Sequence, residues 1–306
     1  MSAGPGPGHS GLTGRAWLAA MPAELTAQRH VIAGLADRCE TWPLAMSLLV
    51  GCSLGRGAGD ALSDIDAALG VDAERSAAGG GPVGVVAGLV ERALPDLGQL
   101  VDVLRPEPPA GEQWRQRIFA QFSDGTQLDL AIVAQEDIRL RRRDGGAPDF
   151  VPVYEADPPG SDAGHARGEQ TAAAYAVTAD QVREWAFLGW LALIDLDKYL
   201  RRGSRWEAHN RLHEARHHIW ALWAAAAGAM YPRHGLSQVL DHDPADLPPG
   251  IEATVAGLDA ADLRRAARAS ASVLAAVSTA AARRHPADLP AGLAAYVTRV
   301  LSEGRR

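Results

Sequence analysis

A glycine-rich loop between two short apolar runs constrains this chain more than any other feature. The runs, Met46–Val50 and Ile65–Val71, have the length and composition of buried strands. The loop that joins them, residues 51–63, ends just before Asp64 and Asp66. Because side chains alternate across a strand, these two aspartates point to one face while their neighbours point to the core. The sequence therefore predicts a sheet with a pair of carboxylates where one strand begins.

The pair Asp64 and Asp66 predicts a metal site. Two adjacent carboxylates repel each other and raise each other's pKa unless a cation lies between them. Mg²⁺ prefers a few carboxylates together with water and substrate phosphates. The competing interpretation is a strand end with two solvated aspartates.

A hairpin supplies a third carboxylate. Asp-Gly at positions 124–125, between the apolar runs Arg117–Phe122 and Gln127–Ala134, is a strong hairpin signal. In the second run Asp129 alternates with leucine and isoleucine, and an acid in an apolar strand costs energy without a partner or a metal. We expect Asp129 to complete a two-metal site with the first pair. Asp124 is interpreted as a turn residue.

The loop itself has the composition of a phosphate cradle. Glycines free backbone N–H groups to face an anion, and a helix that begins near Ser53 would add a favourable dipole. The Ser53 hydroxyl is a further donor, and we expect it to bind phosphate together with the backbone of Gly55. Arg56 either contacts phosphate or is solvated.

The string GCSLGRGAGDALSDIDAAL carries a family resemblance. It resembles the G-S-x(10)-D-x-D signature of the polymerase-β nucleotidyltransferase superfamily, and most closely its antibiotic-modifying members. The resemblance covers roughly residues 46–134. It implies a nucleoside triphosphate donor, Mg²⁺, and transfer of a nucleoside monophosphate to an acceptor. One departure stands out: Cys52 occupies the position of the family's glycine, and it would be strained there if the turn needs a positive φ.

The composition changes along the chain and divides it into four segments. Residues 1–23 are rich in Gly, Pro and Ser and predict a disordered tail. Residues 24–138 predict a catalytic domain, with additional helices over 24–40 and 82–94 and a strand over 100–104. Residues 139–178 predict a linker, and residues 179–306 are helical by period and composition. The predicted fold class is an α/β mixed-sheet nucleotidyltransferase domain followed by an all-α helical domain.

The helical segment carries the single lysine of the chain, Lys198. The segment resembles the helical domain that follows the catalytic domain in many small-molecule nucleotidyltransferases, where it helps to bind acceptor and nucleotide. On this basis Lys198 is predicted to bind nucleotide. The alternative is a solvated basic helix end that complements the helix dipole. Towards the C-terminus we expect two further helices, near 251–282 and 287–302.

The net charge and the cysteine content argue against several kinds of partner and site. The formal charge of -7 argues against broad phosphate neutralisation, so a nucleic-acid partner is not expected. Two cysteines without a CxxC pair argue against a zinc site or a disulfide framework and favour the cytoplasm. The apolar run near Met21 is too short to span a membrane.

These features together predict an enzyme. The expected reaction is a Mg²⁺-dependent adenylyl transfer, with two ions, from ATP to a hydroxyl of a small acceptor such as an aminoglycoside antibiotic. The alternative, also implied by the resemblance, is a toxin–antitoxin component that modifies a partner protein or a tRNA.

Overall fold

The computed structural model comprises two compact units, Met1–Ala174 and Tyr175–Arg306. The structure describes residues 11–73, 81–107, 115–143, 150–156, 177–229, 232–234 and 247–303, with the backbone alone for 141–143 and 234. The first ten residues of the predicted tail and most of the predicted linker (144–149 and 157–176) lie outside this part of the chain.

The first unit is built on a six-stranded mixed sheet. Its strands are β1 (Ala45–Val50), β2 (Ile65–Val71), β3 (Leu100–Leu104), β4 (Arg115–Phe122), β5 (Gln127–Ala134) and β6 (Val151–Glu155). Its helices are α1 (Gly14–Ala20), η1 (Ala23–Leu25), α2 (Thr26–Thr41), α3 (Cys52–Arg56), α4 (Gly81–Ala93), η2 (Leu94–Asp96) and α5 (Gln135–Arg143). The order across the sheet is β3-β4-β5-β2-β1-β6. Among the described strands β2 and β5 alone pair in parallel.

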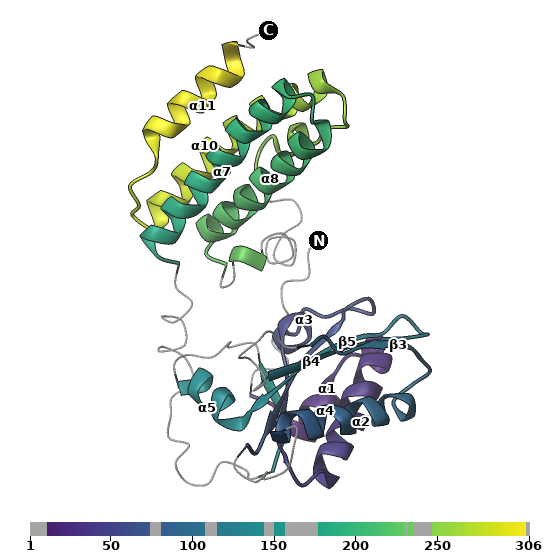
Figure 1. The fold of residues 1–306 in the computed structure, drawn as a ribbon. Coiled ribbons are helices and arrows are strands. Elements are labelled where there is room, and N and C mark those ends of the chain that lie inside the picture. Colours follow the sequence, from purple (N-terminus) through teal and green to yellow (C-terminus); the bar gives the residue numbers. More distant parts are fainter. Residues whose placement is uncertain are drawn as a thin grey trace. The chain divides into compact units, whose positions relative to one another are not determined.

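The two faces of this sheet differ as the alternation of the sequence requires. On one face Ile65, Leu69 and Leu130 are fully buried, and α1, α2 and α4 cover them to form the core (Figure 1). On the other face Asp66 and Asp129 are only half-buried. The mixed-sheet fold class predicted from the sequence is confirmed, and its open face carries the predicted carboxylates.

The predicted disordered tail is wrong for residues 14–23. Helix α1 lies in this segment, and Trp17, Leu18 and Met21 are 1%, 4% and 5% exposed. The apolar run that is too short to span a membrane instead anchors the amino-terminal helix in the core. A helix of only seven residues cannot be recognised from composition when glycines and prolines surround it.

The predicted linker is also wrong in part, because it contains α5 and β6. Strand β6 pairs antiparallel with β1 at the edge of the sheet, with Val151 opposite Val50. Pro152 lies in β6, and proline is tolerated in an edge strand because its missing N–H costs least there. The catalytic domain predicted to end at residue 138 therefore extends to at least residue 155.

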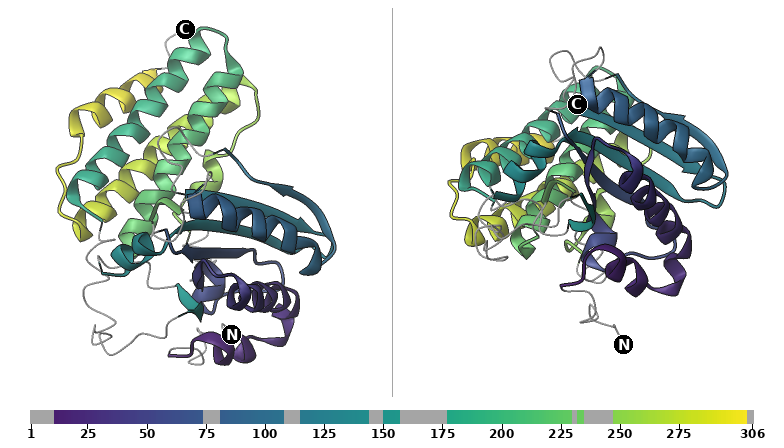
Figure 2. Two further views of the ribbon diagram at one scale, coloured as in Figure 1. Left: turned by 60° about the horizontal axis from the view of Figure 1, so that its bottom comes forward. Right: turned by 90° about the horizontal axis from the view of Figure 1, so that it is seen from below.

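The second unit is a helical bundle, as predicted. Its helices are α7 (Ala179–Arg201), α8 (Arg205–Ala227), α10 (Ala260–Arg284) and α11 (Ala291–Glu303), with short turns η3 (Pro232–His234) and η4 (Ile251–Thr254). Helices α7, α8 and α10 pack side by side (Figures 1 and 2). A Cβ on Gly189 of α7 would lie 2.9 Å from Leu274 of α10, so these two helices approach closely. In the part of the chain that the structure describes, no helix is long and apolar enough to cross a membrane.

Side-chain caps fix where two of these helices begin. The hydroxyl of Thr178 accepts the N–H of Gln181 at 3.1 Å and the Gln181 amide accepts the Thr178 N–H at 3.0 Å, a reciprocal capping box. The carboxylate of Asp259 accepts two N–H groups at the start of α10. This cap begins α10 at Ala260, so the single helix predicted from residue 251 is divided.

Replacing Trp17 with alanine tests the corrected assignment of the amino terminus. Removing a buried tryptophan side chain from a core costs about 3–5 kcal/mol of unfolding free energy. We expect Trp17→Ala to lower the free energy of unfolding in urea by that order. The matched control is Leu12→Ala, since Leu12 is 38% exposed in the same segment. Equal and small effects of both substitutions would contradict the packing of α1.

Candidate active site

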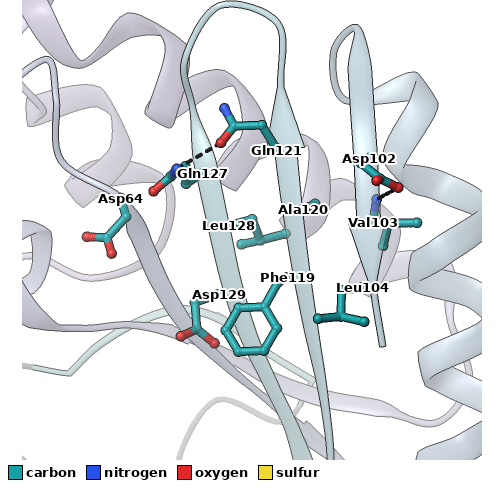
Figure 3. A pocket seen from close by; sticks show the side chains of 10 residues that line it. All are labelled: Asp64, Asp102, Val103, Leu104, Phe119, Ala120, Gln121, Gln127, Leu128 and Asp129. Atoms are coloured by element: carbon teal, nitrogen blue, oxygen red, sulfur yellow. Dashed lines mark hydrogen bonds between the residues drawn. The ribbon is translucent and has the colours of Figure 1, made fainter. Parts of the chain in front are cut away.

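The parallel pairing of β2 with β5 brings two predicted carboxylates together. Asp66 and Asp129 are direct register partners in this pair. Neighbouring strands lie about 4.8 Å apart, so both side chains project from adjacent points of one face. Asp64 is exposed just before β2 begins. Asp64 and Asp129 line one pocket on this face (Figure 3).

The Asp66 carboxylate is partly buried and lies close to two other carboxylates. Partial burial raises its pKa, and the thiol of Cys52 opposes that shift by interacting with the carboxylate. The neighbouring charges of Asp64 and Asp129 raise the pKa further. A cation at this point would relieve both the desolvation and the repulsion.

Arg117 is a residue of the site that sequence reasoning missed. Its Nε donates to Asp129 Oδ1 at 2.7 Å and its Nη2 donates to Asp129 Oδ2, a bidentate pair. The guanidinium also lies over the Phe119 ring, 4.7 Å from its centre, and Asp129 raises the pKa of Arg117. The signal was available: across the predicted hairpin, Arg117 stands on the same face as Asp129 and diagonal to it.

The arrangement has the donor chemistry for Mg²⁺, since carboxylate oxygens are its preferred protein ligands. The described residues contain no group of three His, Cys, Asp or Glu side chains gathered as a metal site. Asp129 is instead directed at Arg117. The binding of metal by Asp64, Asp66 and Asp129 remains a prediction, and an ion would compete with Arg117 for Asp129.

The predicted phosphate loop forms the short helix α3 beside these carboxylates. The N–H of Gly51 donates to the carbonyl of Asp66 at 2.9 Å, which joins the loop to β2. A Cβ at Gly51 would lie 2.7 Å from the Phe150 ring, so a larger residue here would have to displace that ring. Ser53 and Arg56 lie on α3 and are half-buried, as is Gly55. The helix that would direct a dipole to this loop begins at Cys52. Phosphate binding by these residues stays a prediction.

Cys52 has the strain that its place in the motif suggested. Its φ is 53°, and it is the one non-glycine residue with a positive φ among those the structure describes. An L-residue in this region costs roughly 1–2 kcal/mol more than glycine through contact of its Cβ with the backbone. The turn therefore keeps the left-handed geometry of a glycine while carrying a thiol next to Asp66.

A buried glutamine holds the loop that leads into Asp64. Gln28 on α2 is 2% exposed, and its Nε2 donates to the carbonyls of Ala61 and Ser63 at 3.2 and 3.0 Å. Asp60 closes the same loop by accepting the N–H of Leu62 at 2.9 Å. Both contacts fix the backbone immediately before the first aspartate of the pair.

Lys198 belongs to the helical unit. Its ammonium group donates to Asp195 and lies 4.9 Å from the centre of the Tyr199 ring. The structure shows a local ion pair at the end of α7, and nucleotide binding by Lys198 stays a prediction.

Two solved structures are similar to this chain. An aminoglycoside 6-adenyltransferase from Bacillus subtilis is 13% identical, with 92% of this chain and 98% of that chain covered and a TM-score of 0.37. A nucleotidyltransferase-like protein from Exiguobacterium sibiricum 255-15 is 14% identical, with 90% and 81% covered and a TM-score of 0.37. No family model matches the sequence, and no curated protein matches it significantly. At this level of similarity the function must be argued from the residues of this chain.

Replacing Cys52 with glycine tests the strain in the turn. We expect Cys52→Gly to be more stable than Cys52→Ala by about 1 kcal/mol in urea unfolding, because the left-handed backbone disfavours any Cβ. The alanine variant is the matched control, since both substitutions remove the thiol. Equal stability of the two variants would show that the positive φ is not maintained in solution.

Replacing Gln28 with methionine tests the support of the loop. Methionine fills similar space but donates nothing to the carbonyls of Ala61 and Ser63. The loss of these two bonds, each worth about 1 kcal/mol net, would raise hydrogen exchange at the Leu62 and Ser63 amides at least several-fold. Amides of the α2 backbone serve as the internal control. Unchanged exchange in the loop, or an equal rise throughout α2, would contradict the assigned role.

Proposed function

We propose that the chain is a Mg²⁺-dependent nucleotidyltransferase that moves AMP from ATP to a hydroxyl of a small acceptor such as an aminoglycoside. One observation carries the proposal: Asp66 and Asp129 are register partners on adjacent parallel strands. The turn that begins at Gly51 is hydrogen-bonded to Asp66 itself. Paired carboxylates can bind a metal ion, and the glycine-rich turn directly beside them can bind the phosphates of the same substrate.

The turn is assigned to the phosphates of ATP. The first N–H groups of a helix have no partner within it and face outward from its start. In α3 the donor assigned to phosphate is the N–H of Ser53, next to the Ser53 hydroxyl. Gly55 presents its backbone without a side chain, and Arg56 adds a positive charge at the end of α3. Lys198, from the helical unit, is assigned to the same nucleotide.

Asp64, Asp66 and Asp129 are assigned to Mg²⁺. When bound, Mg²⁺ would neutralise charge on the phosphates and help the pyrophosphate to leave. Burial, and after it the neighbouring carboxylates, raise the pKa of Asp66; this is the supporting feature, because a bound cation would relieve both effects.

Asp129 is also assigned as the general base. The acceptor hydroxyl transfers its proton to the Asp129 carboxylate as its oxygen bonds to the α-phosphorus of ATP. The bond from that phosphorus to the bridging oxygen breaks, and pyrophosphate leaves with the electron pair. The two hydrogen bonds from Arg117 fix the direction of the Asp129 carboxylate. Positioning and charge stabilisation would supply most of the rate.

Replacing Asp66 with asparagine is the decisive test. We expect pyrophosphate release from ATP and Mg²⁺, measured across a panel of aminoglycosides, lincosamides and nucleotides, to fall by at least about a hundredfold. Asp37→Asn, a change of an exposed aspartate that pairs with Arg15, is the matched control. Full activity of the Asp66 variant would refute the assignment. Transfer to a protein or a tRNA, with none to the panel, would favour the toxin–antitoxin alternative.

The same variant predicts a separate effect on stability. Because the folded-state pKa of Asp66 is raised, its contribution to stability is present at low pH and is lost as pH rises through that pKa. Without metal at neutral pH, Asp66→Asn should therefore melt at a higher temperature than the wild type. The difference should shrink as the pH is lowered into the carboxylate range, and added Mg²⁺ should raise the melting temperature of the wild type alone. A less stable variant at neutral pH would contradict the electrostatic argument.

A further inference from the structure

The open face of the sheet is organised in two transverse rows (Figure 3). Strand register places Leu104, Phe119 and Asp129 side by side, and Asp66 continues this first row. A second row, one step along the strands, consists of Asp102, Gln121 and Gln127, with Asp64 beyond it. The first row ends at the proposed reaction centre. The second row and β3 have no part in the chemistry assigned so far.

The first row gives this part of the face an apolar floor. Leu104 is 60% exposed and lies beside Phe119, which separates it from the Asp129 carboxylate (Figure 3). The pocket over both rows has a volume of about 630 Å³. Pockets of roughly 300–1,000 Å³ with an apolar lining and a few convergent polar groups are typical small-molecule sites.

The polar atoms of the second row have a fixed direction. Gln121 Nε2 donates to the carbonyl of Phe122 at 2.9 Å, so its Oε1 faces Gln127 and accepts from Gln127 Nε2 at 2.8 Å. This chain of bonds leaves Gln127 Oε1 as an outward acceptor. Asp102 accepts the N–H of Val103 with one oxygen, and its second oxygen is available. The amide network therefore presents acceptors to a ligand.

The charged side chains that line the pocket are all carboxylates, and the guanidinium of Arg117 lies beside them, paired with Asp129. Asp64, Asp102 and Asp129 line it, and the described lining residues include neither lysine nor arginine. Apart from one N–H of Gln127, their outward side-chain polar atoms accept hydrogen bonds. The complementary ligand is rich in donors and positively charged, with hydroxyl and ammonium groups on an apolar-backed ring.

We propose that the β3–β5 part of this pocket is the acceptor subsite, and that Asp102 and Gln127 determine which acceptors are used. The inference rests on the proposed nucleotidyl transfer. The acceptor lies on Phe119 and Leu104 with its reacting hydroxyl at Asp129. An ammonium group at its far end pairs with Asp102, two strands away and two residues further along, and thus roughly 12 Å from the reaction centre. Gln127 Oε1, two residues along β5 from Asp129, accepts a second hydroxyl of the acceptor.

Isothermal titration of the full-length protein with kanamycin, which carries several ammonium groups, tests the subsite in the absence of nucleotide. We expect Asp102→Asn to weaken binding about tenfold, because a hydrogen bond to an ionised partner is lost. Asp102→Lys should abolish binding through like-charge repulsion. Gln127→Leu should weaken it several-fold. Trehalose, a neutral hydroxylated disaccharide, should bind to the wild type more weakly than kanamycin does. Its affinity should be the same for the wild type and for Asp102→Asn.

Asp96→Asn is the matched control, because Asp96 is an exposed aspartate of the same unit that pairs with Arg38. Failure of the wild type to bind kanamycin, or equal affinity in the wild type and Asp102→Asn, would overturn the subsite. The proposed function is judged separately by pyrophosphate release. If transfer is intact and the acceptor KM is unchanged in Asp102→Asn, only the subsite is wrong. If Asp102→Asn weakens kanamycin binding but no acceptor supports transfer, the subsite binds a cation without the proposed reaction.

Discussion

The parallel pairing of β2 with β5 is the constraint on which the candidate site depends. The other pairs of described strands are antiparallel: three join strands that follow one another in the chain, and the fourth joins β6 to β1. Only the parallel pair β2–β5 carries both carboxylates. This one pair sets Asp66 opposite Asp129, and the register leaves no freedom: a shift by one residue would send Asp129 to the core and Leu130 to the open face. The buried leucines and isoleucines on the reverse face hold that register. The hydrophobic core thus specifies the geometry of the carboxylates.

Arg117 resolves a conflict that this register creates. The pairing gathers negative charge at a half-buried position, which is unfavourable without a cation. The Arg117 guanidinium neutralises part of the negative charge by pairing with Asp129, while the pKa of Asp66 stays raised. The neutralisation is therefore partial, and a divalent ion would find one carboxylate already oriented and another in need of a partner.

The sequence predicted most of the sheet and the main carboxylates because both depend on local pattern. Alternation marks Ile65–Val71 and Gln127–Ala134 directly, and a motif with fixed spacing marks Asp64 and Asp66. Helix α1 and strand β6 were missed because glycine and proline dominate the composition around them, while Trp17 and Val153 are buried through tertiary contacts. Arg117 was missed for a similar reason: its partner is defined by the pairing of strands, which a single sequence indicates only after the hairpin register is drawn.

The same strand pairing has a consequence for how the protein acquires its site. Asp129 lies roughly sixty residues beyond Asp66 in the chain, and the two meet only after the segment between them has closed on itself. Contacts between distant segments form late and slowly compared with hairpins and helices. A partly folded chain, with the β4–β5 hairpin made but β2 not yet docked, would hold Asp129 beside Arg117 without a second carboxylate opposite. The proposed binding of a divalent cation would therefore require the completed fold, and it would report on the docking of β2.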